Sequence, residues 1–245
     1  MSAAVYPLAR ISAFFLSSPL YGDGLVPPRV LIALTLAITA LLMPTLIPLQ
    51  VPDLFSLPGL WAVVQEVIIG VWMGLALHFA LAIFLLAAQM VGLQMGLGFA
   101  QLVDPVYGGQ IPLLGQYYRF LVYLLLLASE GHLAMIRTVG FSFERIPIGT
   151  LPGINAVGEM ITLTGGIFAG AIRVVLPVII GLFLANFTLG VITRAAPQMN
   201  IFSVGFAFLI PLGYLMLLFT LPQLYVHVQE YFGEIMLYIS GLHGS

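Results

Sequence analysis

The 245-residue chain contains no cysteine and no lysine, and only 7% of its residues are charged. Without cysteine it can form no disulfide, thiolate nucleophile, iron–sulfur cluster or thiolate zinc site. Without lysine it has neither the phosphate-binding lysine of a P-loop nor an amine for Schiff-base chemistry. These absences exclude most nucleotide-driven enzymes and most covalent enzymes.

Positive charge is also scarce. All seven basic residues are arginines, and the formal net charge is -2. Binding to nucleic acid depends on a basic surface that neutralises phosphates and releases their counterions. The sequence therefore predicts no nucleic-acid partner.

Hydrophobic residues make up 61% of the chain, and the mean hydropathy is +1.14. Ordinary soluble domains carry about 25% charged residues, and a helix needs about 20 apolar residues to cross a bilayer. We predict an all-α membrane-class protein of bent and broken helical hairpins, forming a single domain over residues 1–245. About six or seven apolar helices are expected: 5–20, 29–49, 59–86, 87–103, 117–143, 157–195 with a break near Gly165 and Gly166, and 201–238 with a bend near Pro211 or Pro222.

Several ionisable side chains lie inside these apolar segments. Such groups are costly in an apolar environment unless they pair or face water. They are interpreted either as a proton or ion relay or as polar anchors between packed helices, and the second interpretation is favoured because no aligned series of carboxylates accompanies them. Glu130 and Arg137 are seven residues apart, which would place them near one helix face. These side chains are Glu66, Glu130, His132, Arg137, Glu159 and Arg173, of which Glu66, Glu130, His132 and Arg137 are the candidate buried polar residues.

Small residues recur at a spacing of four. Gly70 and Gly74 follow Glu66 in this register, and Gly92 and Gly96 repeat the spacing further along. Small residues at this spacing let two helix backbones approach closely. They predict close helix packing, either within the chain or against other subunits.

No catalytic, cofactor or metal site is expected. The four histidines form no i,i+4 pair and no HExxH motif, so a metal site has no sequence support. Ser129, Glu130 and His132 resemble a catalytic triad only in composition. Because they lie within one helical turn, local hydrogen bonding is the favoured interpretation.

A central interruption, residues 104–116, separates the apolar helices in the middle of the chain. It is rich in glycine and also apolar, whereas loops exposed to water are usually more polar. Non-helical backbone at membrane depth is tolerated where it is buried in protein or lines a cavity. The segment is therefore either a loop folded into an interior or an ordinary turn, and the residues alone favour neither.

A second interruption, near residues 194–200, predicts a helical hairpin turn. Pro197 disfavours helix at the residue before it, and Asn200 can cap the next helix. Arg194 would lie at the end of the preceding helix, where its charge suits the helix dipole. Capping alone explains the polar residues of this turn.

Six segments, taken in order along nearly the whole chain, resemble the FliR family of flagellar biosynthetic proteins. Each segment is weak evidence by itself, but the ordered set is specific. The segments are Pro27–Arg29 before an apolar helix, Glu66–Gly74, Gly92–Ala100 running into Val103–Pro105, Glu130–Leu133, Ile146–Pro152 and Arg194–Phe206.

The resemblance implies a non-enzymatic export-gate subunit of the flagellar type III secretion apparatus, without cofactors. It implies assembly with FliP and FliQ into a helical hetero-oligomeric gate, and contacts with FlhB, FlhA, membrane lipid and, transiently, exported flagellar proteins. The expected location is the bacterial inner membrane, as a multi-pass protein of the flagellar basal body.

The resemblance also implies that the loop after the Val-Asp-Pro motif projects into the export channel and helps to close it. A loop without charge can fill a constriction, and adjacent glycines let its backbone move. The residues assigned to this channel plug are Pro105, Val106, Tyr107, Gly108, Gly109, Gln110, Ile111, Pro112, Leu113 and Leu114.

Two alternatives remain open from the sequence. Within the superfamily, the alternative is the homologous export-gate protein of injectisomes, although the segment Arg194–Phe206 favours the flagellar form. From another class, the alternative is a small-solute or ion transporter, supported by Glu66, Glu130 and Glu159 in apolar segments. Transporters often contain matching inverted halves, and no convincing internal repeat is present.

Overall fold

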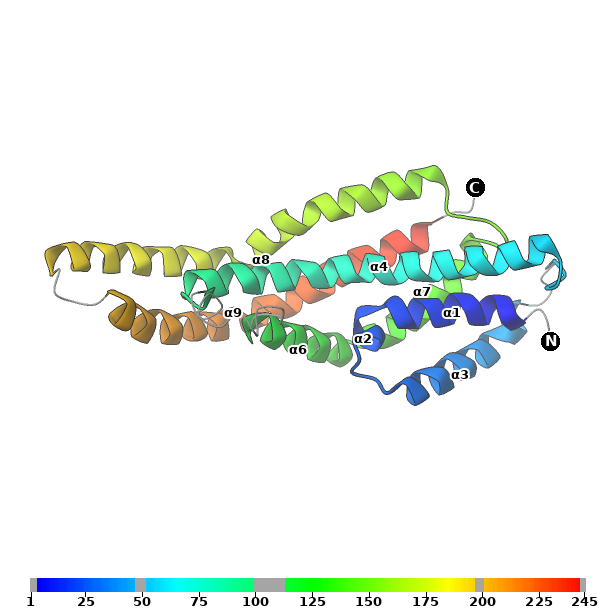
Figure 1. Cartoon of the computed structure of the whole chain (residues 1–245), viewed down its shortest axis with the longest axis horizontal. Helices are drawn as coiled ribbons and strands as arrows, with labels where there is room; N and C mark the ends of the chain where they lie inside the picture. The colour runs from blue at the N-terminus through cyan, green and yellow to red at the C-terminus, as the bar shows by residue number, and fades with distance from the viewer. Residues whose placement is uncertain (1–3, 47–51, 99–112, 197–200, 243–245) are drawn as a thin grey trace. The chain divides into compact units, whose positions relative to one another are not determined.

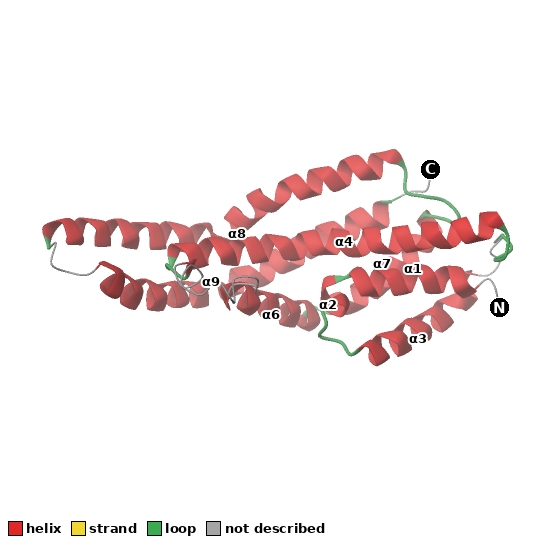
Figure 2. Ribbon diagram, in the orientation of Figure 1, coloured by secondary structure: helices red, strands yellow, loops and turns green. Residues whose placement is uncertain are grey.

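The structure is a computed structural model that describes residues 4–46, 52–98, 113–196 and 201–242. Across these ranges the chain is built of helices and their connections, without a β-strand (Figure 2). The predicted all-α class is therefore confirmed.

Three helices form the N-terminal part: α1 (Val5–Ser17), α2 (Pro19–Gly22) and α3 (Pro28–Leu46). One helix was predicted over 5–20, but Ser18 is extended and Pro19 begins the short α2. Proline suits the first turn of a helix because it has no N–H to satisfy there. In Figure 1, α1 lies between α3 and α4.

The fourth helix, α4 (Leu57–Gln94), is continuous over 38 residues. The prediction of two helices meeting at residues 86 and 87 was wrong. The glycines of this segment suggested a break, whereas Leu86 and Ala87 at the predicted boundary are both good helix formers. The helix ends in a Schellman motif, in which Gly96 takes φ of 81° and Leu97 N–H donates to the Gly92 carbonyl at 2.9 Å.

The predicted single helix over 117–143 is instead two helices, α6 (Leu113–Ala128) and α7 (Gly131–Arg145). Glu130 separates them with a left-handed backbone, φ 57°. A Cβ on Gly131 would lie 2.9 Å from the Leu126 carbonyl oxygen, so the turn after Glu130 requires glycine. Gly131 was the sequence signal for this break, but the apolar residues on both sides favoured a single continuous helix.

Two long helices complete the chain, α8 (Ile154–Ala195) and α9 (Ile201–Gly241). The predicted break near Gly165 and Gly166 is absent, because helical structure continues through both glycines. Prolines also lie within these helices, including Pro211 and Pro222 in α9. Neighbouring residues can satisfy the backbone carbonyls that proline leaves free, so apolar helices tolerate it.

The chain divides into two compact units. Unit 1 comprises Met1–Leu81, Leu126–Gly165 and Glu230–Ser245, and unit 2 comprises Ala82–Leu125 and Gly166–Gln229. Helices α4, α6, α8 and α9 each contribute to both units. The single domain over residues 1–245 remains a prediction.

Three helices of the described chain are long and apolar enough to cross a membrane: α4, α8 and α9, the last counted over Gly205–Gly241. Helices α6 and α7 pass the same test together, although they are bent by 73° relative to each other. By length and composition the number of candidate spans is therefore three or four, as expected for a membrane-class protein.

Candidate functional site

An ion pair lies at the centre of unit 1. Arg10 of α1 donates from Nε to Glu66 Oε2 of α4 at 2.6 Å, and from Nη2 to Oε1 at 3.0 Å. Both side chains are completely buried. Two parallel hydrogen bonds of this kind give an arginine–carboxylate pair its strength and its fixed geometry.

The remaining donors of Arg10 reach α7. Its Nη1 donates to the Ser142 carbonyl at 3.0 Å, and its Nη2 donates to the Ile146 carbonyl at 2.9 Å. The guanidinium also lies 4.2 Å from the centre of the Phe143 ring. One side chain thus joins α1, α4 and α7, which offsets the cost of burying its charge.

Sequence reasoning identified Glu66 as a buried polar residue but did not identify Arg10 as its partner. The two positions are 56 residues apart, and neither helical periodicity nor local spacing links them. The available signal was a lone cation inside an apolar helix, which requires a buried partner.

Glycines form a close contact between α1 and α4. A Cβ on Gly70 would lie 2.7 Å from Ala13 Cβ, and it would also collide with the carbonyl oxygen of Arg10. A Cβ on Gly74 would lie 2.8 Å from Ser17 Cβ. The predicted packing role of Gly70 and Gly74 thus has a definite partner surface, which is α1 of the same chain.

A tyrosine hydroxyl connects three other segments of unit 1. Trp72 Nε1 donates to the Tyr238 hydroxyl at 3.2 Å, and this hydroxyl donates to the Ala156 carbonyl at 2.8 Å. The bonds join α4, the last turns of α9 and the first turns of α8. They fix one wall of a recess beside Tyr238.

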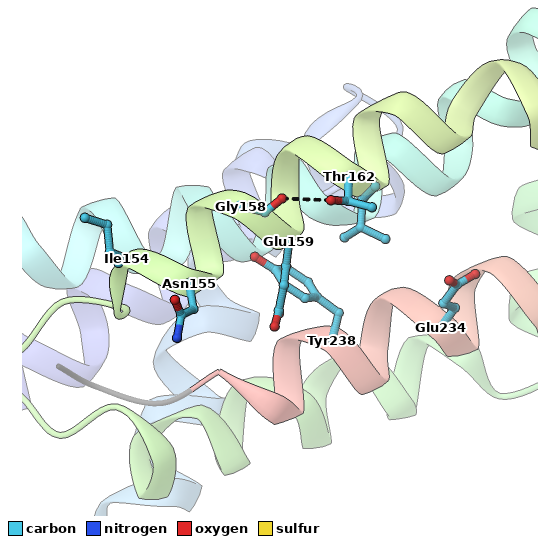
Figure 3. A pocket seen from close by; sticks show the side chains of 8 residues that line it. Ile154, Asn155, Gly158, Glu159, Thr162, Glu234 and Tyr238 are labelled. Atoms are coloured by element: carbon cyan, nitrogen blue, oxygen red, sulfur yellow. Dashed lines mark hydrogen bonds between the residues drawn. The ribbon is translucent and has the colours of Figure 1, made fainter.

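The recess lies between the first turns of α8 and the last turns of α9 and has a volume of about 670 Å³ (Figure 3). Glu159 points into it from α8, and Glu234 faces it from α9. The lining residues are Ile154, Asn155, Gly158, Glu159, Thr162, Leu163, Glu234 and Tyr238.

In unit 2, the end of α4 is fixed by a side chain of α8. Asn186 Nδ2 donates to the Gln94 carbonyl at 3.0 Å and to the Leu182 carbonyl at 3.0 Å. A Cβ on Gly92 would be in ordinary contact with Leu114 of α6, at 3.5 Å. Asn186 therefore holds the end of α4, and Leu114 at the start of α6 lies beside Gly92.

Several other predicted site residues lie apart from these contacts. Glu130, Arg137 and Arg194 are exposed, and Arg194 lies in the last turn of α8, as predicted. His132 is half-buried, and its Nδ1 has no hydrogen-bond partner among the described residues. Asn200 lies outside the described residues.

Glu130 and Arg137 form no ion pair with each other, because Glu130 precedes α7 instead of continuing its helix. Ser129 Oγ donates to the Leu126 carbonyl at 3.1 Å. This bond is the local hydrogen bonding expected for Ser129. Within the described ranges, no three His, Asp or Glu side chains are grouped so that they could hold a metal ion.

Most of the predicted channel plug, Pro105 to Pro112, lies outside the described residues. Leu113 and Leu114 are described, and they form the first residues of α6. Leu113 is exposed and Leu114 is buried. The assignment of a plug remains a prediction.

Comparison with known proteins decides the family. The model of the bacterial export proteins, family 1, matches residues 1–235. The chain belongs to this family.

Relatives of this export-protein family span most of the chain. The flagellar biosynthetic protein FliR of Pectobacterium carotovorum subsp. carotovorum is 35% identical over 96% of this chain and 90% of its own length. FliR of Escherichia coli strain K12 is 34% identical over 94% of this chain and 88% of its own length. FliR of Bacillus subtilis strain 168 is 29% identical over 91% of this chain and 87% of its own length. The resemblance inferred from the ordered sequence segments is confirmed.

Proposed function

We propose that this protein is a non-enzymatic membrane subunit of the flagellar type III export apparatus, where it helps to form and close the channel for exported flagellar proteins. One observation carries the proposal: the chain matches the export-protein family over residues 1–235, and relatives named FliR cover nearly all of it.

The exposed surface supports an assembled state. In the most apolar window of α8 only 33% is buried within the chain, and in that of α9 only 22%. Phe168, Phe187 and Phe219 are 69%, 66% and 77% exposed. Apolar surface on this scale is normally covered by partner subunits or lipid. Such exposed apolar surface on the isolated chain is expected of a subunit that belongs to a larger membrane assembly.

The finer proposal names the partners and the location. FliP and FliQ form the gate with this chain, FlhB and FlhA contact it, and exported flagellar proteins pass through it transiently. The assembly belongs to the bacterial inner membrane and the flagellar basal body, with this chain as a multi-pass component.

We further assign the central segment Pro105–Leu114 to channel closure. The structural support is the fixation of its flanks, where Asn186 holds the end of α4 and Gly92 lies against Leu114. A segment with fixed ends can close a channel without loosening the helices that carry it.

Native mass spectrometry of the tagged chain, purified in mild detergent with and without co-expressed FliP and FliQ, tests the proposal. A defined hetero-oligomer is expected. A stable monomer or homo-oligomer that ignores both partners would contradict it and favour a solute or ion transporter. Restored motility in a strain lacking its own FliR would distinguish the flagellar subunit from an injectisome homologue.

A further inference from the structure

The recess between α8 and α9 presents two carboxylates that have no counter-ion in the part of the chain that the structure describes. Neither Glu159 nor Glu234 forms an ion pair with another described residue, and both side chains are exposed. Glu66, in contrast, is fully buried and paired with Arg10. Among the described residues, the carboxylate that the chain buries has a cation beside it, whereas the two carboxylates of the recess form no ion pair.

The walls of the recess offer apolar surface and open space that the described chain does not fill. Ile154 is 88% exposed at its mouth, which is costly for a large apolar side chain in water. A Cβ on Gly158 would meet nothing within 4 Å, so no part of the described chain uses the space above this glycine. Glycine inside a helix is less favourable than alanine, so an exposed glycine there has no local benefit. Close approach of a partner backbone would use both features.

Charge is distributed unevenly between the two units. Eight of the nine carboxylates and four of the seven arginines lie in unit 1, so its formal charge is -4 and that of unit 2 is +2. The recess belongs to the negative unit. Complementarity of charge therefore favours a cationic occupant.

We infer that this recess receives an apolar helix of another export-apparatus subunit, with an arginine or lysine of that helix placed between Glu159 and Glu234. The inference rests on the proposed function, because it requires that the chain assembles with other export proteins. An arginine would form charge-assisted hydrogen bonds with the carboxylates, while Ile154 and Leu163 would pack on its apolar neighbours.

A helix fits this surface better than a small cation or a lipid headgroup does. A hydrated ion would leave Ile154 uncovered, and the phosphate of a lipid headgroup would be repelled by the two carboxylates, whereas a helix with a cationic side chain would cover Ile154 and pair with them. Burying two carboxylates beneath an uncharged helix would be strongly unfavourable. The recess should therefore select a helix whose arginine or lysine lies level with the two carboxylates.

Because the chain contains no cysteine, one cysteine introduced at the recess would be its only thiol, and a thiol reagent would label that position alone. A Thr162→Cys variant places one thiol on the recess wall, and Glu144→Cys places one at an exposed position of α7 as a reagent control. We expect a water-soluble maleimide to label the thiol at position 162 in the isolated chain and to react about tenfold or more slowly in the assembled complex. Equal labelling rates at position 162 in both states would overturn the inference.

The role of charge is tested in the same complex, with Thr162→Cys as the background. The E159Q/E234Q variant keeps the side-chain shapes and is expected to restore labelling at position 162 and to lower the recovery of complex at limiting partner about tenfold. Glu144→Gln removes an exposed charge outside the recess and should change neither value. If E159Q/E234Q behaves like Glu144→Gln, the carboxylates do not bind a cationic helix.

The occupant is identified by a photoreactive cross-linker attached to the thiol of the Thr162→Cys variant in the purified complex. The expected product joins this chain to an apolar peptide of another export subunit that contains arginine or lysine. Cross-links only to lipid, or to a second copy of this chain, would overturn the inference while leaving the proposed function intact. If the wild-type chain forms no complex with export subunits, the proposed function itself fails.

Discussion

Arg10 and Glu66 are joined by two hydrogen bonds of 2.6 and 3.0 Å, although both side chains are shielded completely from solvent. A buried ion pair of this geometry is costly to break, because removal of one partner leaves the other charge buried and unpaired. Loss of either Arg10 or Glu66 alone should therefore weaken the packing of α1 against α4.

The first prediction compares removal of the Arg10 charge alone with removal of both charges of the Arg10–Glu66 ion pair. Arg10→Leu should lower the free energy of unfolding by about 3–5 kcal/mol, whereas Arg10→Leu combined with Glu66→Leu should recover much of this loss because no lone charge remains. Denaturant unfolding in detergent measures both values in a double-mutant cycle. Arg137→Leu is the control, since Arg137 is exposed. Additive losses from the two substitutions would contradict the pairing.

The second prediction concerns the glycine contact between α1 and α4. Gly70→Val should lower stability by about 1–3 kcal/mol or more, because its side chain would meet the backbone of Arg10, which cannot move aside cheaply. Gly158→Ala has open space and should be neutral or slightly stabilising in the isolated chain. Melting temperatures in detergent measure both effects. Equal melting temperatures for the two variants would show that α1 does not pack closely on Gly70.

The third prediction tests how the end of α4 is held. Asn186→Leu keeps the approximate side-chain volume but removes the donor to the Gln94 carbonyl, and it should cost about 1–2 kcal/mol. Amide hydrogen exchange should become faster in the last turn of α4. Thr188→Val is the control, because Thr188 Oγ1 bonds to the Leu184 carbonyl of its own helix. Unchanged exchange at the end of α4 in Asn186→Leu would argue against this contact.

The fourth prediction concerns channel closure. Deletion of residues 106–111 should increase ion leakage through the closed gate, because the deletion shortens the segment assigned to the constriction. Conductance of the purified complex in planar bilayers measures the leakage, and native mass spectrometry must first show that the variant assembles. Leakage equal to that of the wild-type complex, with assembly intact, would count against a plug at these residues.

Composition and apolar run length were sufficient to predict the all-α membrane class, since these properties depend on the whole chain. The positions where one helix ends and the next begins depend on single residues, and these positions were predicted less well. Leu86 and Ala87 continue α4, although the glycines of this segment suggested a break. Glu130 breaks the helix predicted over 117–143, because a left-handed backbone followed by Gly131 outweighs the surrounding apolar periodicity.

The candidate residues show the same limit at the level of contacts. The four-residue spacing marked Gly70 and Gly74 as candidate packing positions, but it could not reveal that Ala13 and Ser17 face them. The same spacing marked Gly96, whose structural role is to end α4 with a left-handed backbone. Contacts between residues distant in the chain require the tertiary structure, so Arg10 could not be assigned to Glu66 in advance.

The left-handed backbone of Glu130 has an evolutionary consequence. It turns the chain so that α7 does not continue the line of α6, and α7 with the residue after it supplies the Ser142 and Ile146 carbonyls that bind Arg10. A substitution that straightened position 130 would withdraw both carbonyls and leave Arg10 with Glu66 alone. Residues 10, 66 and 130 should therefore covary among relatives, although they belong to three different segments of the sequence.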